Sequence, residues 1–203
     1  MKSDKKKRIL NAMEQLMCMM PNKEISVGLI AKTAELGKGS LYDYFESKEE
    51  ILYAVIERCY KKAIHEYFEK IQSEVSAMDK IRLLFCSILK NEFKDNQKNL
   101  IRTLHLHEDL LLHNKKKLVA VQELSPILED LLLQGIEEGS IWTETPKESA
   151  EMIVAVLTFF LDNTVLPEND SSILKKLKIF SNVLDTCLRA EKGSLEFLWK
   201  SNL

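Results

Sequence analysis

The side chains best suited to contacting a partner are concentrated in one short stretch near the N-terminus, from Lys38 to Tyr44. The stretch places an ammonium group, hydroxyl groups and a glycine on one side of an expected helix, and that side has no part in a hydrophobic pattern. Ammonium and hydroxyl groups are donors to the phosphates and base edges of DNA, and a helix with such an outer face can enter a major groove. The residues of this outer face are Lys38, Gly39, Ser40, Tyr42 and Asp43.

Residues 25–48 around this stretch have the pattern of a helix-turn-helix followed by the start of a third helix. From Val27 onwards, apolar or small side chains recur at the positions where two steeply crossing helices must touch, and Leu36 lies in the turn between them. Ser26 is a good N-cap for the first of these helices, and Ser47 with Glu50 has the spacing of a capping box. The expected core positions of the motif are Ile30, Ala31, Ala34, Leu36, Leu41 and Tyr44.

This stretch resembles the DNA-binding arm of the TetR family of bacterial transcriptional repressors. Members of that family share a signature similar to KGxLYxYFxxKEEL, which is matched here by residues 38–45 together with residues 48–52. The matching motif spans about a quarter of the chain. The total length of the chain and the position of the motif near the N-terminus also fit the family. It implies an N-terminal DNA-binding domain and a helical C-terminal domain that binds a small molecule and forms a two-fold dimer.

Two residues in the turn depart from the family pattern. Glu35 occupies the turn position that is usually glycine, where a left-handed backbone costs another residue roughly 1 kcal/mol. The turn is therefore either mildly strained or slightly different in geometry. Gly37 stands where the family usually has serine or threonine, which removes one side-chain cap and one phosphate contact.

We assign the expected DNA contacts in two groups. The predicted groove contacts are Lys38, Ser40 and Tyr42, and Gly39 lets the helix approach the DNA backbone closely. The predicted phosphate contacts are Ser26, Tyr44 and Lys48. Lys48 is included because it occupies the first turn of a helix, where its charge is unfavourable unless an anion such as a phosphate binds there. A purely structural role remains an alternative for Tyr42 and, more strongly, for Tyr44, whose spacing also matches a core position.

Charge and composition set limits on the type of protein. The 203 residues carry a net charge of −2, but residues 1–48 hold nine basic and six acidic side chains, so this part has +3 and the remainder −5. A basic N-terminal part on an acidic remainder suits a protein that meets phosphate at one end only. Lys5, Lys6, Lys7 and Arg8 at the start could contact phosphate or form a solvated helix start.

The cysteines and the apolar runs point to the cytoplasm. Four cysteines lie far apart without paired spacing, which favours reduced, buried thiols over disulfides or a zinc site. We find no signal peptide, and the longest apolar run, residues 152–161, has about half the length that a membrane-spanning helix needs. We therefore expect a cytoplasmic protein without membrane contact. The cysteines are Cys18, Cys59, Cys86 and Cys187.

Helical spacing of apolar residues recurs almost everywhere, so we predict an all-α fold. The domains are expected to be residues 1–48, which bind DNA, and residues 49–203, which bind an effector and dimerise, with a helix at about 47–70 linking them. Further helices are expected at about 4–20, 76–93, 97–113, 116–138, 146–164 and 171–190. Residues 114–117 are expected to form a solvated loop or helix start, and Ser125-Pro126 a bend or restart.

The helices at about 146–164 and 171–190 are predicted to form the interface of a homodimer. The first is apolar around most of its circumference between Met152 and Leu161, which implies burial on two sides. The pair could form a four-helix bundle with the same pair of a second subunit. The alternative is a monomer with an unusually central helix. A dimer with two recognition helices would bind an inverted-repeat operator in double-stranded DNA.

The effector is predicted to be a small molecule, and the sequence does not identify it. His105, Asp109 and His113 are four residues apart and form one stripe on a helix, which could hold a metal ion or the polar end of a ligand. Three ligands on one helix face make a weak metal site, so no metal and no cofactor are predicted, and a solvated stripe is the default. The candidate effector-binding residues are Phe85, Phe93, His105, Asp109, Trp142 and Phe159, and each of the aromatic ones could equally be core.

No motif in the chain indicates an enzyme. It has no glycine-rich phosphate loop, no GxSxG elbow, no HExxH and no paired cysteine motif. We therefore predict a transcriptional regulator, with repression implied by the family resemblance alone. The alternative is a helical scaffold or partner-binding protein that retains a helix-turn-helix without binding DNA, an alternative that Glu35 and Gly37 leave open.

Overall fold

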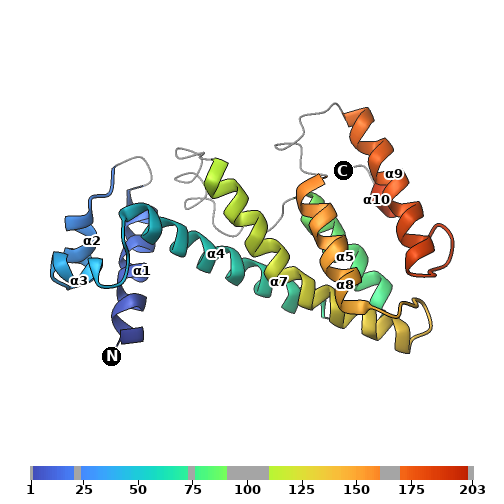
Figure 1. Ribbon diagram of the computed structural model, residues 1–203, viewed down its shortest axis with the longest axis horizontal. Helices are drawn as coiled ribbons and strands as arrows, with labels where there is room; N and C mark the ends of the chain where they lie inside the picture. Colours follow the sequence, from blue (N-terminus) through green and yellow to red (C-terminus); the bar gives the residue numbers. More distant parts are fainter. Residues whose placement is uncertain (1, 21–23, 73–75, 91–109, 161–169, 201–203) are drawn as a thin grey trace. The chain divides into compact units, whose positions relative to one another are not determined.

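The computed structural model describes residues 2–20, 24–72, 76–90, 110–160 and 170–200, and all regular elements within these ranges are helices (Figure 1). The chain divides into two compact units. The head unit comprises the described parts of residues 1–62 and 94–116, and the body unit those of residues 63–93 and 117–203. Two long helices, α4 (Lys48–Ile71) and α7 (Leu110–Glu137), each contribute to both units.

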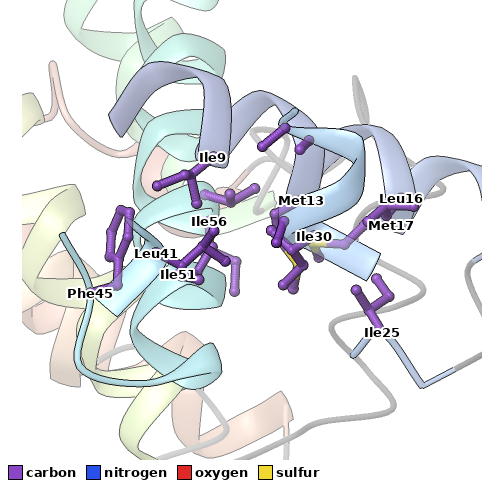
Figure 2. Packing of buried hydrophobic residues seen from close by; sticks show 14 of the residues in the cluster. Ile9, Met13, Leu16, Met17, Ile25, Ile30, Leu41, Phe45, Ile51 and Ile56 are labelled. Atoms are coloured by element: carbon purple, nitrogen blue, oxygen red, sulfur yellow. The ribbon is translucent and has the colours of Figure 1, made fainter. Parts of the chain in front are cut away.

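Three N-terminal helices and the start of α4 build the core of the head unit. α1 (Lys2–Met19), α2 (Val27–Thr33) and α3 (Lys38–Tyr42) bury apolar side chains against α4, and Figure 2 shows these side chains converging from all four helices. The predicted helix-turn-helix is thus present, and its expected core positions are buried, except that Leu36 and Tyr44 are only partly buried. The largest fully buried side chains of this core are Ile9, Met17, Ile30, Leu41 and Ile51.

Local capping fixes where these helices begin. The Ser26 hydroxyl accepts a hydrogen bond from the Leu29 amide at 3.2 Å, as expected for an N-cap. Ser47 likewise accepts from the Glu50 amide at 3.1 Å, and the Glu50 carboxylate accepts from the amide of Glu46, one residue before the cap. The N-caps predicted for α2 and α4 are therefore confirmed. The Glu50 carboxylate, however, accepts from the amide of Glu46 and not from that of the N-cap residue Ser47.

The turn after α2 bears the strain that Glu35 predicts. Glu35 has φ 52°, in the left-handed region, and Arg8 of α1 holds the turn from outside. The Arg8 guanidinium donates to the carbonyls of Ala34 and Glu35 at 2.7 and 3.1 Å and to the Glu35 carboxylate at 3.2 Å. A cation bound to the last carbonyls of a helix is favoured by their partial negative charge. Arg8 therefore has a structural task that its place in a basic run did not reveal.

Replacing Glu35 with glycine should stabilise the head unit. Glycine adopts positive φ without steric cost, so we expect a gain of up to about 1 kcal/mol in the free energy of unfolding, measured by chemical denaturation. The carbonyl contacts of Arg8 remain in this variant. Glu35→Gln is the matched control, since it removes the exposed ion pair but keeps the strained backbone, and it should not stabilise. A Glu35→Gly protein no more stable than Glu35→Gln would show that the turn is not strained.

The body unit is built from the remaining helices. These are α5 (Ala77–Lys90), the main part of α7, α8 (Pro146–Ala155), a π-helical turn η2 (Val156–Phe160), α9 (Asp170–Cys187) and the short α10 (Phe197–Lys200). α5 contacts both η2 and α10, and α10 contacts α9. The start of α5 is tied to the end of α7, because the Glu138 carboxylate accepts from the Ala77 amide at 3.0 Å and the Lys80 ammonium donates to Gln134 at 3.0 Å.

The course of α7 corrects two expectations. Residues 114–117 are neither a loop nor a helix start but lie inside the helix, and Lys117 is buried. Pro126 also lies within the helix without ending it. Proline removes the amide that would bond to the carbonyl of Gln122, and both residues are exposed, so water can satisfy that carbonyl. α7 ends as predicted, with Gly139 at φ 71° just beyond it.

Other expectations hold in part. The helix predicted at 146–164 begins at Pro146 but changes to a π-turn at Val156, and the one predicted at 171–190 runs from Asp170 to Cys187. Cys59 is buried, but Cys18 and Cys187 are exposed, so the expectation of buried thiols is wrong for these two. Partial burial and, to a lesser extent, the nearby Glu14 carboxylate raise the pKa of the Cys18 thiol. Within the described ranges, no helix is long and apolar enough to cross a membrane.

Candidate nucleic-acid interface

α3 is held in the head unit by one side chain. Leu41 is 1% exposed and is the only buried residue of the helix, where it packs beside Phe45 and Ile51 (Figure 2). The remaining positions point outward: Lys38 and Gly39 are exposed, Ser40 is half-buried, and Tyr42 is 55% exposed. The predicted groove-contacting face is therefore solvent-exposed in this structure.

Nothing inside the protein explains the glycine at position 39. A Cβ added to Gly39 would have no heavy atom within 4 Å other than its own helix and chain neighbours, and its φ is not positive. A helical glycine costs about 0.5–1 kcal/mol relative to alanine, so its presence here has no internal benefit. A glycine on an exposed helix face is expected where another molecule must approach the backbone closely.

The three predicted phosphate contacts lie in different settings. Ser26 is exposed and its hydroxyl already accepts the capping bond, which leaves its proton for an external acceptor. Lys48 is partly buried, and its ammonium lies 3.6 Å from the exposed Glu24 carboxylate, an ion pair of little net strength. Tyr44 is half-buried and packs against the head core. These placements leave Ser26 and Lys48 accessible and favour a mainly structural ring for Tyr44.

Gly39→Ala should change stability and DNA affinity in opposite directions. The added methyl should raise the free energy of unfolding by about 0.5–1 kcal/mol, because alanine favours the helix. The same methyl should weaken binding to duplex DNA, because it occupies the surface nearest the partner. Denaturation and fluorescence anisotropy with a labelled duplex measure the two effects. Unchanged DNA affinity in the stabilised variant would show that no close approach occurs at this position.

The effector candidates among the described residues have different surroundings. Phe85 is fully buried, with its ring centroid 6.4 Å from that of Phe197, so it is a core residue. Phe159 is partly buried on η2, and Trp142 is exposed beneath the Arg189 guanidinium, which lies 3.8 Å from its ring centroid. Phe93, His105 and Asp109 lie outside the described residues.

Exposed apolar side chains occur on the two helices predicted to form the dimer. Met152 on α8 is 67% exposed, and Ile179 on α9 is 64% exposed. Val183 follows Ile179 by one helical turn on the same face and is also exposed. Exposed apolar side chains one turn apart on a helix face, such as Ile179 and Val183, are compatible with an interaction site.

An exposed helix-turn-helix joined to a helical body defines a DNA-binding transcriptional regulator, and comparison with known proteins gives the family. Residues 23–55 match the model for bacterial regulatory proteins of the tetR family, and residues 93–183 match that of the tetracyclin repressor-like C-terminal domain. The two matches together span more than half of the chain. The chain belongs to the TetR family, is not an enzyme, and has the predicted all-α fold.

Known relatives agree with this assignment. The fatty acid metabolism regulator protein of Bacillus subtilis (strain 168) is 25% identical over 166 residues, which cover 81% of this chain and 83% of the relative. The uncharacterized HTH-type transcriptional regulator YhgD of the same strain is 23% identical over 152 residues, covering 74% and 78%.

Solved structures show the same fold. RolR in complex with resorcinol superimposes with a TM-score of 0.62 at 17% identity, over 98% of this chain and 94% of that one. The repressor QsdR of R. erythropolis gives a TM-score of 0.61 at 14% identity, over 92% and 95%.

Proposed function

We propose that this regulator is a ligand-responsive repressor that binds an inverted-repeat operator as a homodimer. The observation that carries the proposal is the outer face of α3, which is exposed and has no internal partner for Gly39, while Leu41 anchors the helix from behind. In this proposal Lys38, Ser40 and Tyr42 contact base edges, and Ser26, Tyr44 and Lys48 lie at or beside the phosphates. The DNA-binding domain is residues 1–48, and residues 49–203 bind the effector and dimerise.

Dimerisation through the helices at 146–164 and 171–190 accounts for the exposed Met152, Ile179 and Val183. A two-fold dimer presents two copies of α3, and such a pair recognises half-sites about one DNA turn, roughly 34 Å, or a multiple of it apart. The symmetry of the protein then requires a palindromic operator.

Ligand response follows from linkage between effector and DNA binding. An effector that binds the DNA-free state better releases the operator, and a tenfold change in affinity needs about 1.4 kcal/mol of difference between the two states. The regulated genes are proposed to be metabolic, because one relative, 25% identical to this chain, is a fatty acid metabolism regulator. The proposed effector contacts are those predicted from the sequence, Phe85, Phe93, His105, Asp109, Trp142 and Phe159; of these, Phe85 also contacts Phe197, and Trp142 also contacts Arg189.

Selection of bound duplexes from a random pool tests the proposal. The purified protein is incubated with the pool at low and near-physiological salt, and we expect an enriched inverted repeat whose affinity falls steeply as salt rises. Lys38→Ala and Tyr42→Ala should abolish the enrichment, while Lys147→Ala, which removes an exposed lysine of α8, should not. No enrichment at either salt would contradict operator binding by the ligand-free protein and favour the scaffold alternative.

A further inference from the structure

α3 has few local ties that would fix its direction in the head unit. Its N-cap residue, Gly37, makes no side-chain capping bond, and a Cβ added there would have no heavy atom within 4 Å beyond its chain neighbours. Leu41 anchors one side of the helix, and a helix of five residues has little stability of its own. The direction of α3 therefore depends on the turn that precedes it.

Arg8 of α1 holds this turn by hydrogen bonds. All of its bonds to the turn use the single nitrogen Nη2, and two of them end on the carbonyls of Ala34 and Glu35. No backbone amide of the described residues donates to either carbonyl. Glu35 has φ 52°, so the turn keeps a backbone conformation that is unfavourable for its residue type. Arg8 therefore ties a strained turn to α1.

The same segment of α1 also contacts the chain just after α3. The Lys6 ammonium lies 5.5 Å from the centroid of the Phe45 ring, and Phe45 packs in the head core beside Leu41 (Figure 2). α1 thus contacts the chain on both sides of α3, at Arg8 before the helix and at Lys6 after it. The Arg8 contacts are hydrogen bonds, which are the shorter and the more directional of the two.

We propose that Arg8 is a positioning residue for operator recognition. By holding the turn at Glu35, it sets the direction in which the outer face of α3 meets the DNA. Hydrogen bonds to base edges require that alignment, whereas contacts with phosphates carry no sequence information. Arg8 therefore controls the discrimination between operator and unrelated DNA. The inference rests on the DNA-binding function proposed above.

The ratio of operator affinity to affinity for a scrambled duplex tests this role in the full-length protein. Fluorescence anisotropy measures both affinities, with the operator that the random pool yields. Arg8→Met should lower the ratio about tenfold or more, mainly through weaker operator binding, because base contacts carry discrimination of this size. Lys7→Met removes an exposed cation from the same segment and should leave the ratio unchanged.

Two further variants separate positioning from stability. Leu16→Ala removes a buried α1 side chain at the other end of the core from Leu41 and Phe45 (Figure 2), so it should destabilise the head unit and keep the ratio. Arg8→Lys serves if circular dichroism shows that Arg8→Met does not fold. Its ratio should follow its free energy of unfolding: both are retained where the ammonium bonds to the turn, and both fall where it does not.

The outcomes that overturn the inference differ from those that overturn the proposed function. An unchanged ratio in folded Arg8→Met, or in a destabilised Arg8→Lys, would overturn the positioning role and leave operator binding intact. An equal loss of affinity for both duplexes, with a salt slope smaller by about one, would also overturn it, since that result indicates a phosphate contact. A wild-type protein that yields no operator would overturn the proposed function and this inference with it.

Discussion

Ile179→Asp should convert the protein from a dimer to a monomer and reduce operator affinity by at least about a hundredfold. Ile179 is 64% exposed in the single chain, on the face of α9 that also carries Val183. In a dimer this face would be buried, and a carboxylate there would lose its hydration without a partner, at a cost of several kcal/mol. Two linked α3 helices gain about 10²–10⁴ in affinity over one, and the monomer loses this gain.

Sedimentation velocity gives the oligomeric state, and fluorescence anisotropy with the selected operator gives the affinity. Leu133→Asp is the matched control, because Leu133 is also an exposed aliphatic side chain. It lies on α7, outside the predicted interface. It should remain dimeric and bind DNA normally. An Ile179→Asp protein that stays dimeric would place the interface elsewhere and remove the support that α9 gives to the proposed function.

The parts of the fold that the sequence predicted are those fixed by neighbouring residues. Ser26 and Ser47 cap the helices that follow them, and Gly139 closes α7 with a positive φ. These signals act within one turn of helix, so a single sequence contains them completely. The helix-turn-helix benefits most, because its core positions and the cap of its first helix lie within a short stretch.

The parts that the sequence did not predict depend on distant contacts. Residues 114–117 looked like a solvated loop or helix start, but Lys117 is buried and its ammonium lies 5.4 Å from the ring centroid of Phe159, a residue far along the chain. Arg8 was expected either to contact phosphate or to lie in a solvated helix start, but it binds the turn at Glu35. In both cases a charged side chain has a tertiary role that composition and periodicity do not show.

For the candidate site, the sequence distinguished the exposed face of α3 from its buried one. It could not assign which exposed residues contact DNA, since that depends on a partner. Tyr44 illustrates the limit: its spacing matched both a core position and a phosphate contact, and its ring packs against the core while remaining half-exposed. The DNA contacts therefore remain predictions for mutagenesis.

Leu41→Ala should eliminate operator binding. The cause is the loss of a core contact that docks α3, since the variant leaves the DNA-contacting side chains unchanged. α3 has five residues, too few to be stable alone, and Leu41 is its only buried side chain. Removing a fully buried leucine side chain beyond Cβ costs about 2–5 kcal/mol, and here the loss falls on the contact that docks α3. We expect a head unit destabilised by this amount and a loss of specific DNA binding comparable with that of Lys38→Ala.

The two variants differ in how they lose binding. Lys38 is exposed, so Lys38→Ala should keep the wild-type free energy of unfolding, whereas Leu41→Ala should lower it in chemical denaturation. Leu41→Met nearly conserves volume and should recover most of the stability and the binding. The dimer should persist in all three variants, because its predicted contacts lie in α8 and α9. Normal operator binding by Leu41→Ala would mean that α3 does not need its core anchor and that another element recognises the DNA.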